Sequence, residues 1–269
     1  MHRKRVVVAL IGLPLLLAVL FLAPLWAFGC AVAVAAAGVQ VEFYRLHAAR
    51  LPTAEWRAAV IFGLVTSLAA VTGEPAAVLA MLTGSTFAVF LYALFRPEAA
   101  RSAAERVGLL VFGLVYGPVL LSHAVLARAM PDHLGPGAVL LALAAAWGGD
   151  TAAYYGGKSL GRRKLYPAVS PGKTWEGAAA GLVGTVAAAL LVRAWLLPDV
   201  PVRHVLVLGV VAAVVGQLGD LCESLLKRGA GVKDSGGLLP GHGGLLDRLD
   251  SFLFVAPLVY YYLRVLEAA

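Results

Sequence analysis

The sequence has little charge and almost no cysteine. Only 14% of its 269 residues are Asp, Glu, Lys or Arg, whereas 61% are hydrophobic; a soluble globular protein is nearer ~25% charged. The two cysteines, Cys30 and Cys222, lie in apolar surroundings and have neither the number nor the spacing of a disulfide framework or a metal site. No polar stretch is long enough to build a separate soluble core. These shortages exclude a soluble enzyme and a disulfide-rich secreted domain, and they predict a membrane protein.

Long apolar runs are what the chain has in abundance. A helix needs about 20 residues to cross ~30 Å of hydrocarbon. We predict an all-α polytopic membrane protein with about nine transmembrane helices, at 6–22, 25–41, 58–73, 75–95, 107–127, 136–155, 174–197, 202–226 and 251–267. Residues 1–23 also have the basic start and apolar core of a signal peptide, but apolar runs continue to the end, so we expect a retained first helix. Only Ala23-Pro24 separates the first two runs, so one kinked helix and eight spans is the alternative.

The basic residues predict the topology. With nine spans and a cytoplasmic N-terminus, 18 of the 22 Lys and Arg residues fall in cytoplasmic segments, all except Arg128, Arg193, Arg203 and Arg264. The positive-inside rule expects this bias, so the net charge of +7 reflects topology and not nucleic-acid binding. Two glycine-rich polar loops, 156–173 and 227–250, then share the cytoplasmic face. We divide the chain into residues 1–135, with about five spans, and residues 136–269, with about four.

Acidic residues gather around these two loops. Seven of the 15 acids border them: Asp150, Glu176, Asp220, Glu223, Asp234, Asp247 and Asp250. Ionisable residues in or at the mouth of membrane helices are costly and usually functional. Asp220 is followed after three, four and seven residues by Glu223, Ser224 and Lys227. At this spacing the four side chains share one helix face. An Asp220–Lys227 surface ion pair is the plain alternative.

Two acidic pairs, Asp220 with Glu223 and Asp247 with Asp250, predict a divalent cation site. Carboxylate oxygens without a Cys or His cluster favour Mg²⁺ over zinc. A metal ion beside several cationic side chains is typical of a polyphosphate-binding site, because both offset the negative charge of the phosphates. Nearby glycines let backbone N–H groups approach phosphates closely. The cations are Lys227, Arg228, Lys233 and Arg248. A basic loop that contacts anionic lipids is the alternative, but it leaves the acids unexplained.

The 156–173 loop ends at the start of a predicted helix. Lys173 and that helix N-terminus could hold an anion. Glu176 in the first turn is either functional or a plain capping and dipole residue. Three cations in the loop, Arg162, Arg163 and Lys164, are most simply topology charges or lipid contacts.

Three segments carry a family resemblance. Ser224 to Asp250 contains S-x-L-K-R, K-D-x-G and H-G-G-L-x-D-R-L-D in this order. Trp147–Gly157 contains W-G-x-D-x-x-A-Y-x-x-G, and Ser170–Gly177 contains S-P-x-K-T-x-E-G. These elements resemble the phosphatidate cytidylyltransferase (CDP-diacylglycerol synthase) family over roughly the last 120 residues. The first 140 residues resemble it only in being a run of membrane helices.

The resemblance implies an enzyme that joins CTP and phosphatidic acid to give CDP-diacylglycerol and pyrophosphate, with Mg²⁺. It implies metal ligands at Asp220 and Asp247, a supporting role for Asp250, and a catalytic role for Lys227. The expected contacts with CTP and its phosphates are Lys173, Ser170, Ser224, Arg228, Lys233, Asp234, His242 and Arg248. A second, monovalent cation such as K⁺ is implied as well. The expected location is a bacterial inner (plasma) membrane, with the site facing the cytoplasm; a homodimer is left open.

Three rival functions remain to be separated from this one. A CTP-dependent lipid kinase shares the substrates' chemistry and stays an alternative. A CDP-alcohol transferase needs a D-G-x-x-A-R motif, which the sequence lacks. A cation-coupled transporter predicts charges near the bilayer midplane and broken helices in both halves, whereas the polar residues here cluster at one face of one half.

Overall fold

The computed structural model describes residues 2–95, 101–237 and 243–268, with side chains from residue 12 onward. The chain forms two compact units. The first comprises Met1–Leu126 and Asp234–Asp247, and the second comprises Ala127–Lys233 and Arg248–Ala269. The segment Asp234–Asp247, called the signature loop below because it carries parts of the K-D-x-G and H-G-G-L-x-D-R-L-D elements, therefore belongs with the N-terminal helices.

Helices build most of the first unit: α1 (His2–Leu22), α2 (Leu25–Leu46), α3 (Thr53–Ala69), α4 (Pro75–Leu94), α5 (Ala103–Leu114) and most of α6 (Leu120–Arg128). Pro24, with an extended backbone, separates α1 from α2, so the structure has two helices where one kinked helix was the alternative. Pro118 lies in a π-helical turn (Val115–Val119) between α5 and α6, where its missing N–H interrupts the helical hydrogen bonds.

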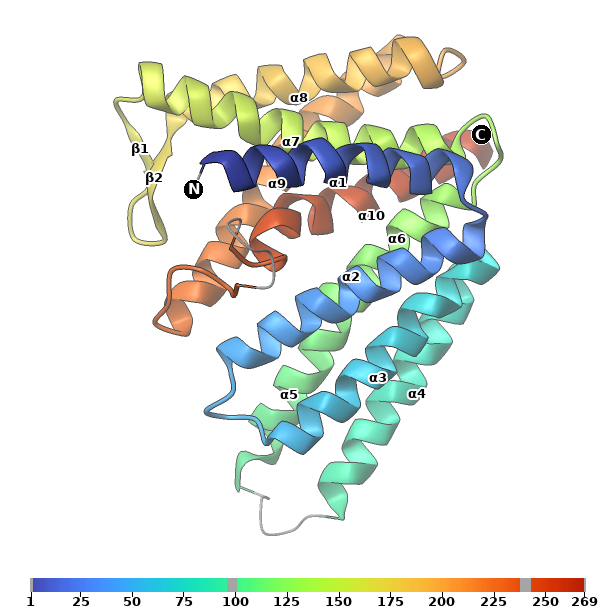
Figure 1. Cartoon of the computed structure of the whole chain (residues 1–269), viewed down its shortest axis with the longest axis vertical. Helices are drawn as coiled ribbons and strands as arrows, with labels where there is room; N and C mark the ends of the chain where they lie inside the picture. Colours follow the sequence, from blue (N-terminus) through green and yellow to red (C-terminus); the bar gives the residue numbers. More distant parts are fainter. Residues whose placement is uncertain (1, 96–100, 238–242, 269) are drawn as a thin grey trace. The chain divides into compact units, whose positions relative to one another are not determined.

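Buried polar contacts join helices α2, α3 and α5, which Figure 1 shows side by side. The Tyr44 hydroxyl donates to the Leu110 carbonyl at 2.7 Å and accepts a hydrogen bond from Gln40 Nε2 at 2.9 Å. Arg106 of α5 forms a buried ion pair with Glu55 of α3, and its Nε lies 3.0 Å from Glu55 Oε2. Polar groups among apolar helices need such partners, so these contacts fix how the three helices pack.

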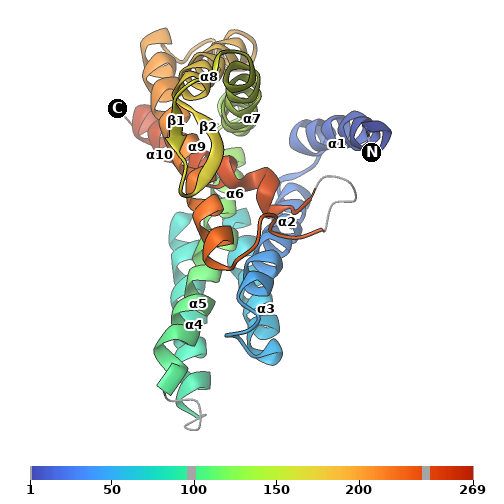
Figure 2. The same cartoon turned by 90° about the vertical axis from the view of Figure 1, so that its left-hand side faces the viewer.

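The second unit contains α7 (Gly135–Leu160), a hairpin of β1 (Lys164–Tyr166) and β2 (Ser170–Thr174), α8 (Trp175–Leu196), α9 (Val202–Gly229) and most of α10 (Leu246–Ala268). Helices α7 and α8 lie side by side in Figures 1 and 2, with the hairpin joining them at one end. Glycines at their contact allow this approach: a Cβ at Gly148 would lie 2.9 Å from the Cβ of Ala188.

Seven described helical segments are long and apolar enough to cross a membrane: Leu25–Leu46, Thr53–Thr72, Pro75–Leu94, Ala103–Arg128, Trp175–Leu196, Val202–Gly229 and Leu246–Ala268. This confirms an all-α polytopic membrane protein. The other two predicted spans, 6–22 and 136–155, lie in the helices α1 and α7, but neither helix is among the seven. Glycines and Asp150 lower the hydropathy of α7. The count of nine spans and their orientation stay predictions.

The two polar loops are shorter than predicted. Helix α7 continues to Leu160, and the rest of the 156–173 loop is mainly the antiparallel hairpin, which pairs Lys164 with Thr174 and Tyr166 with Ser170. Helix α9 continues to Gly229 and α10 begins at Leu246, so the stretch between the two helices is 230–245, of which the structure describes 230–237 and 243–245 as non-helical. A three-residue strand carries too little periodicity to be recognised in sequence.

Candidate active site

The hairpin is fastened to the start of α8. The Glu176 carboxylate accepts hydrogen bonds from the backbone N–H groups of Arg162, at 3.0 Å, and Arg163, at 3.2 Å. Thr174 caps α8, because its hydroxyl accepts the N–H of Gly177 at 3.1 Å. Glu176 is therefore not the capping residue; it holds the chain entering the hairpin that carries Ser170 and Lys173.

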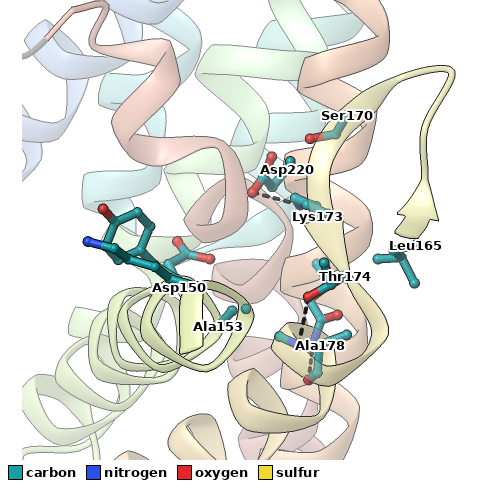
Figure 3. Close-up of a pocket in the computed structure, with 14 residues that line it drawn as sticks. Asp150, Ala153, Leu165, Ser170, Lys173, Thr174, Ala178 and Asp220 are labelled. Atoms are coloured by element: carbon teal, nitrogen blue, oxygen red, sulfur yellow. Dashed lines mark hydrogen bonds and ion pairs between the residues drawn. The ribbon is translucent and has the colours of Figure 1, made fainter. Parts of the chain in front are cut away.

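A cavity of about 390 Å³ lies between this hairpin and helices α7, α8 and α9 (Figure 3). Its volume falls within the ~300–1,000 Å³ range of small-molecule sites. Polar side chains from α7, the hairpin and α9 line it: Asp150, Lys158, Ser170, Lys173, Thr174, Gln217 and Asp220. The W-G-x-D, S-P-x-K-T and α9 segments, separate in sequence, thus meet at one cavity.

Opposite charges meet inside the cavity. Lys173 Nζ of β2 lies 2.7 Å from Asp220 Oδ2 of α9, with 23% and 27% of the two side chains exposed. Asp150 of α7 is close enough to both residues to be repelled by the Asp220 carboxylate and attracted by the Lys173 ammonium group. Figure 3 shows Asp150 across the cavity from the Lys173–Asp220 pair. One ammonium group thus faces two carboxylates.

The residues that were predicted to share one face of α9 do contact one another along the helix. Their ion pairs, however, are not the Asp220–Lys227 pair that was the alternative explanation. Ser224 Oγ lies 3.5 Å from Asp220 Oδ1. Lys227 pairs with Glu223, one turn earlier, and Glu223 is fully buried. Asp220 pairs with Lys173, so no Asp220–Lys227 pair is needed to explain this face.

Helix α10 adds Asp250 to the pair of acids Asp150 and Asp220. Asp250 is 9% exposed and is repelled by both Asp220 and Asp150. The next residue, Ser251, donates its hydroxyl to Asp150 Oδ1 at 3.2 Å and its N–H to Asp250 Oδ1 at 2.7 Å. Three carboxylates in one apolar unit repel one another unless cations offset them; a cation site here is therefore electrostatically reasonable.

Asp247 belongs to the first unit, where it organises the signature loop. Its carboxylate accepts the N–H of Ser235 at 3.2 Å and of Gly244 at 3.0 Å. Ser235 Oγ in turn donates to Glu42 of α2 at 3.2 Å. Glu42 was not expected from sequence, where it directly follows the predicted span 25–41; its acidic character at the end of that apolar run was the only signal.

The remaining predicted residues have mixed environments. Arg228 Nε donates to the Val169 carbonyl at 3.3 Å and Nη1 to the Val232 carbonyl at 3.1 Å, so its side chain supports the hairpin backbone. Three of the predicted substrate contacts are exposed: Lys233, Asp234 and Arg248. His242 lies outside the described residues.

The acids offer oxygen ligands only. No group of three or more His, Cys, Asp or Glu side chains within 2–95, 101–237 and 243–268 is arranged to hold a metal by itself. Mg²⁺ in proteins is often held by one or two carboxylates, with the substrate's phosphates and water as its other ligands. The residues present therefore fit Mg²⁺ that is bound together with a nucleotide.

A model of the cytidylyltransferase family matches residues 3–266. The chain belongs to this cytidylyltransferase family. It is 36% identical to a phosphatidate cytidylyltransferase of Synechocystis sp. over 294 aligned positions, covering 99% of this chain and 98% of that one. It is 42% identical to one of Bacillus subtilis over 161 residues, or 60% of each chain. The uncharacterized protein YnbB of Escherichia coli is 43% identical over 161 residues, 59% of this chain and 54% of that protein.

Proposed function

We propose that this cytidylyltransferase acts on CTP and phosphatidic acid and releases CDP-diacylglycerol and pyrophosphate. The observation that carries the proposal is the cavity where Lys173 meets Asp150 and Asp220. It lies in a chain that matches a phosphatidate cytidylyltransferase over almost its whole length. A membrane protein built mostly of apolar helices also suits a diacyl substrate.

The reaction needs no nucleophile from the protein. An oxygen of the lipid phosphate attacks the α-phosphorus of CTP, and the bond from that phosphorus to the β-phosphate oxygen breaks, so pyrophosphate leaves. The protein supplies alignment and stabilises the charge that develops on the phosphates. Lys173 Nζ has three N–H donors and can bind Asp220 and a phosphate oxygen together. Lys227, held by Glu223, supplies a second cation from the same α9 face.

The divalent metal that cytidylyltransferases generally require is proposed to bind Asp220 and Asp247, with Asp250 in support. When bound, it would offset negative charge on the phosphates of CTP. The structure describes Asp220 and Asp247 in separate units, so their joint role stays a prediction from the resemblance. The same holds for a second, monovalent cation such as K⁺.

We also propose nine spans in a bacterial inner membrane, with the cavity facing the cytoplasm. The distribution of Lys and Arg supports this orientation. In that arrangement CTP reaches the cavity from the cytoplasm, while the lipid enters sideways from the bilayer. A cysteine introduced into the hairpin at Tyr166, which is 50% exposed, tests the orientation: an impermeant thiol reagent should label it in inside-out vesicles and not in intact cells. Cys30 and Cys222 are replaced by serine beforehand.

The activity test uses purified protein in mixed micelles with CTP, phosphatidic acid and Mg²⁺. We expect CDP-diacylglycerol and pyrophosphate in equal amounts. A parallel reaction with diacylglycerol tests the lipid-kinase alternative, which would give CDP and phosphatidic acid. Absence of CDP-diacylglycerol over a range of Mg²⁺ and lipid concentrations would overturn the proposal.

A further inference from the structure

Glu42 is a buried carboxylate outside every motif of the family resemblance. It lies in the last turns of α2, is 1% exposed, and belongs to the first unit together with the loop Asp234–Asp247. A buried acid needs partners that offset the cost of removing it from water. Its partners show what it does.

Both ends of the signature loop are bonded to Glu42. Its Oε2 accepts the backbone N–H of Leu246, at 2.8 Å, and the hydroxyl of Ser235, at 3.2 Å. Leu246 is the first residue of α10, so the carboxylate supplies an acceptor for one of the N–H groups that a helix start leaves without an intrahelical partner. A negative charge is also favoured at that end of a helix.

Ser235 links Glu42 to the predicted metal ligand Asp247. Its hydroxyl donates to Glu42 while its N–H donates to Asp247, whose carboxylate also accepts the N–H of Gly244. Moving the loop away from Glu42 would therefore disturb the bonds that orient Asp247.

Two signature glycines pack directly against the Glu42 carboxylate. A Cβ at Gly236 would lie 2.6 Å from Oε1, and one at Gly244 would lie 2.7 Å from Oε2. Cβ contacts under 3.0 Å are essentially never seen. At these two positions the glycines give the loop backbone room to reach Glu42, a role that differs from the approach to phosphates predicted from sequence.

We propose that Glu42 is a positioning residue that anchors the signature loop to α2 and thereby orients Asp247. The N-terminal helices, which lie outside the three segments of the family resemblance, would then contribute to catalysis through this carboxylate. Its effect on turnover rests on the proposed function, whereas the anchoring itself does not.

Hydrogen–deuterium exchange of the full chain in detergent tests the anchoring without substrate. In Glu42→Leu, which keeps the helix and its packing volume, the Leu246 amide loses its acceptor. We expect peptides covering 233–237 and 243–248 to exchange about tenfold faster or more, because a hydrogen bond to a charged group is lost. Ser235→Ala removes one of the two bonds and should give a smaller increase.

Glu55→Gln is the matched control. Glu55 is also a buried carboxylate of the first unit, but its partner is Arg106 and not the loop. We expect loop exchange in Glu55→Gln to stay within about twofold of wild type, even if the unit is less stable. Loop exchange that rises equally in both variants, or does not rise in Glu42→Leu, would overturn the anchoring. If Glu42→Leu cannot be purified, loop exchange in Ser235→Ala and Glu42→Gln is measured instead, and the same comparison with Glu55→Gln tests the anchoring.

Kinetics test the consequence for Asp247. We expect kcat for CDP-diacylglycerol formation to fall about tenfold or more in Glu42→Leu and less in Glu42→Gln, which keeps one oxygen acceptor. Normal kcat in Glu42→Leu with faster loop exchange would refute the positioning role while leaving the anchoring intact. A wild-type protein that makes no CDP-diacylglycerol would refute the proposed function instead, and the exchange result would still stand.

Discussion

Replacing Lys173 by methionine removes the ammonium group that faces Asp220 and Asp150 in the cavity. At 2.7 Å and an effective dielectric constant of ~20, the Lys173–Asp220 attraction is about 6 kcal/mol before desolvation is subtracted. Because about a quarter of each side chain is exposed, solvent screening reduces the net contribution to a small part of that figure. A phosphate bound by the same ammonium gains a charge-assisted hydrogen bond of about 1.5–3 kcal/mol.

The expected result for Lys173→Met is a loss in kcat/KM for CTP of about 10- to 150-fold, the kinetic equivalent of that hydrogen bond. The assay is CDP-diacylglycerol formation in micelles at saturating phosphatidic acid. Lys164→Met is the matched control, because Lys164 is an exposed lysine of the same hairpin and does not line the cavity. A kcat/KM for Lys173→Met within threefold of the Lys164→Met value would refute the role of Lys173 in binding phosphate.

The remaining predictions concern the acids. Asp220→Asn and Asp247→Asn should each lower kcat at least about 100-fold with an unchanged elution profile, since each removes a predicted metal ligand; near-normal turnover would remove that residue from the site. Glu176→Gln should speed tryptic cleavage after Arg162 several-fold, because a neutral amide holds the two backbone N–H groups more weakly; unchanged cleavage would contradict its role in holding the hairpin. Glu55→Leu should lower the free energy of unfolding by about 3–5 kcal/mol, because Arg106 stays buried without its partner; adding Arg106→Leu should restore most of it.

Several features of the fold followed from local sequence patterns. Apolar runs predicted the membrane class and helices over seven of the spans, which the structure confirms. Pro24 marked the break between α1 and α2, because proline supplies no N–H to continue a helix. The acids and lysines of the last two loops were also found, since charge among apolar helices stands out in a sequence.

The contacts of those charged residues were not predictable in the same way. Helical spacing placed Asp220 near Lys227, whereas the structure pairs Asp220 with Lys173 of the hairpin and Lys227 with Glu223. Spacing along one helix shows which residues share a face, but it carries no information about a partner from another element. The hairpin itself was missed because β1 has only three residues and β2, Ser170–Thr174, shows no alternation of apolar and polar side chains.

By itself, the sequence determined that this is a membrane protein with a cytidylyltransferase signature and where most of its helices run. Hydropathy and motif spacing are properties of neighbouring residues, so they can be recognised without a fold. Only the tertiary structure decided that Lys173 faces Asp220 and that Glu42 holds both ends of the signature loop. Glu42 is 193 residues from Ser235 along the chain; only helix packing, which no local pattern specifies, brings such distant residues within hydrogen-bonding distance.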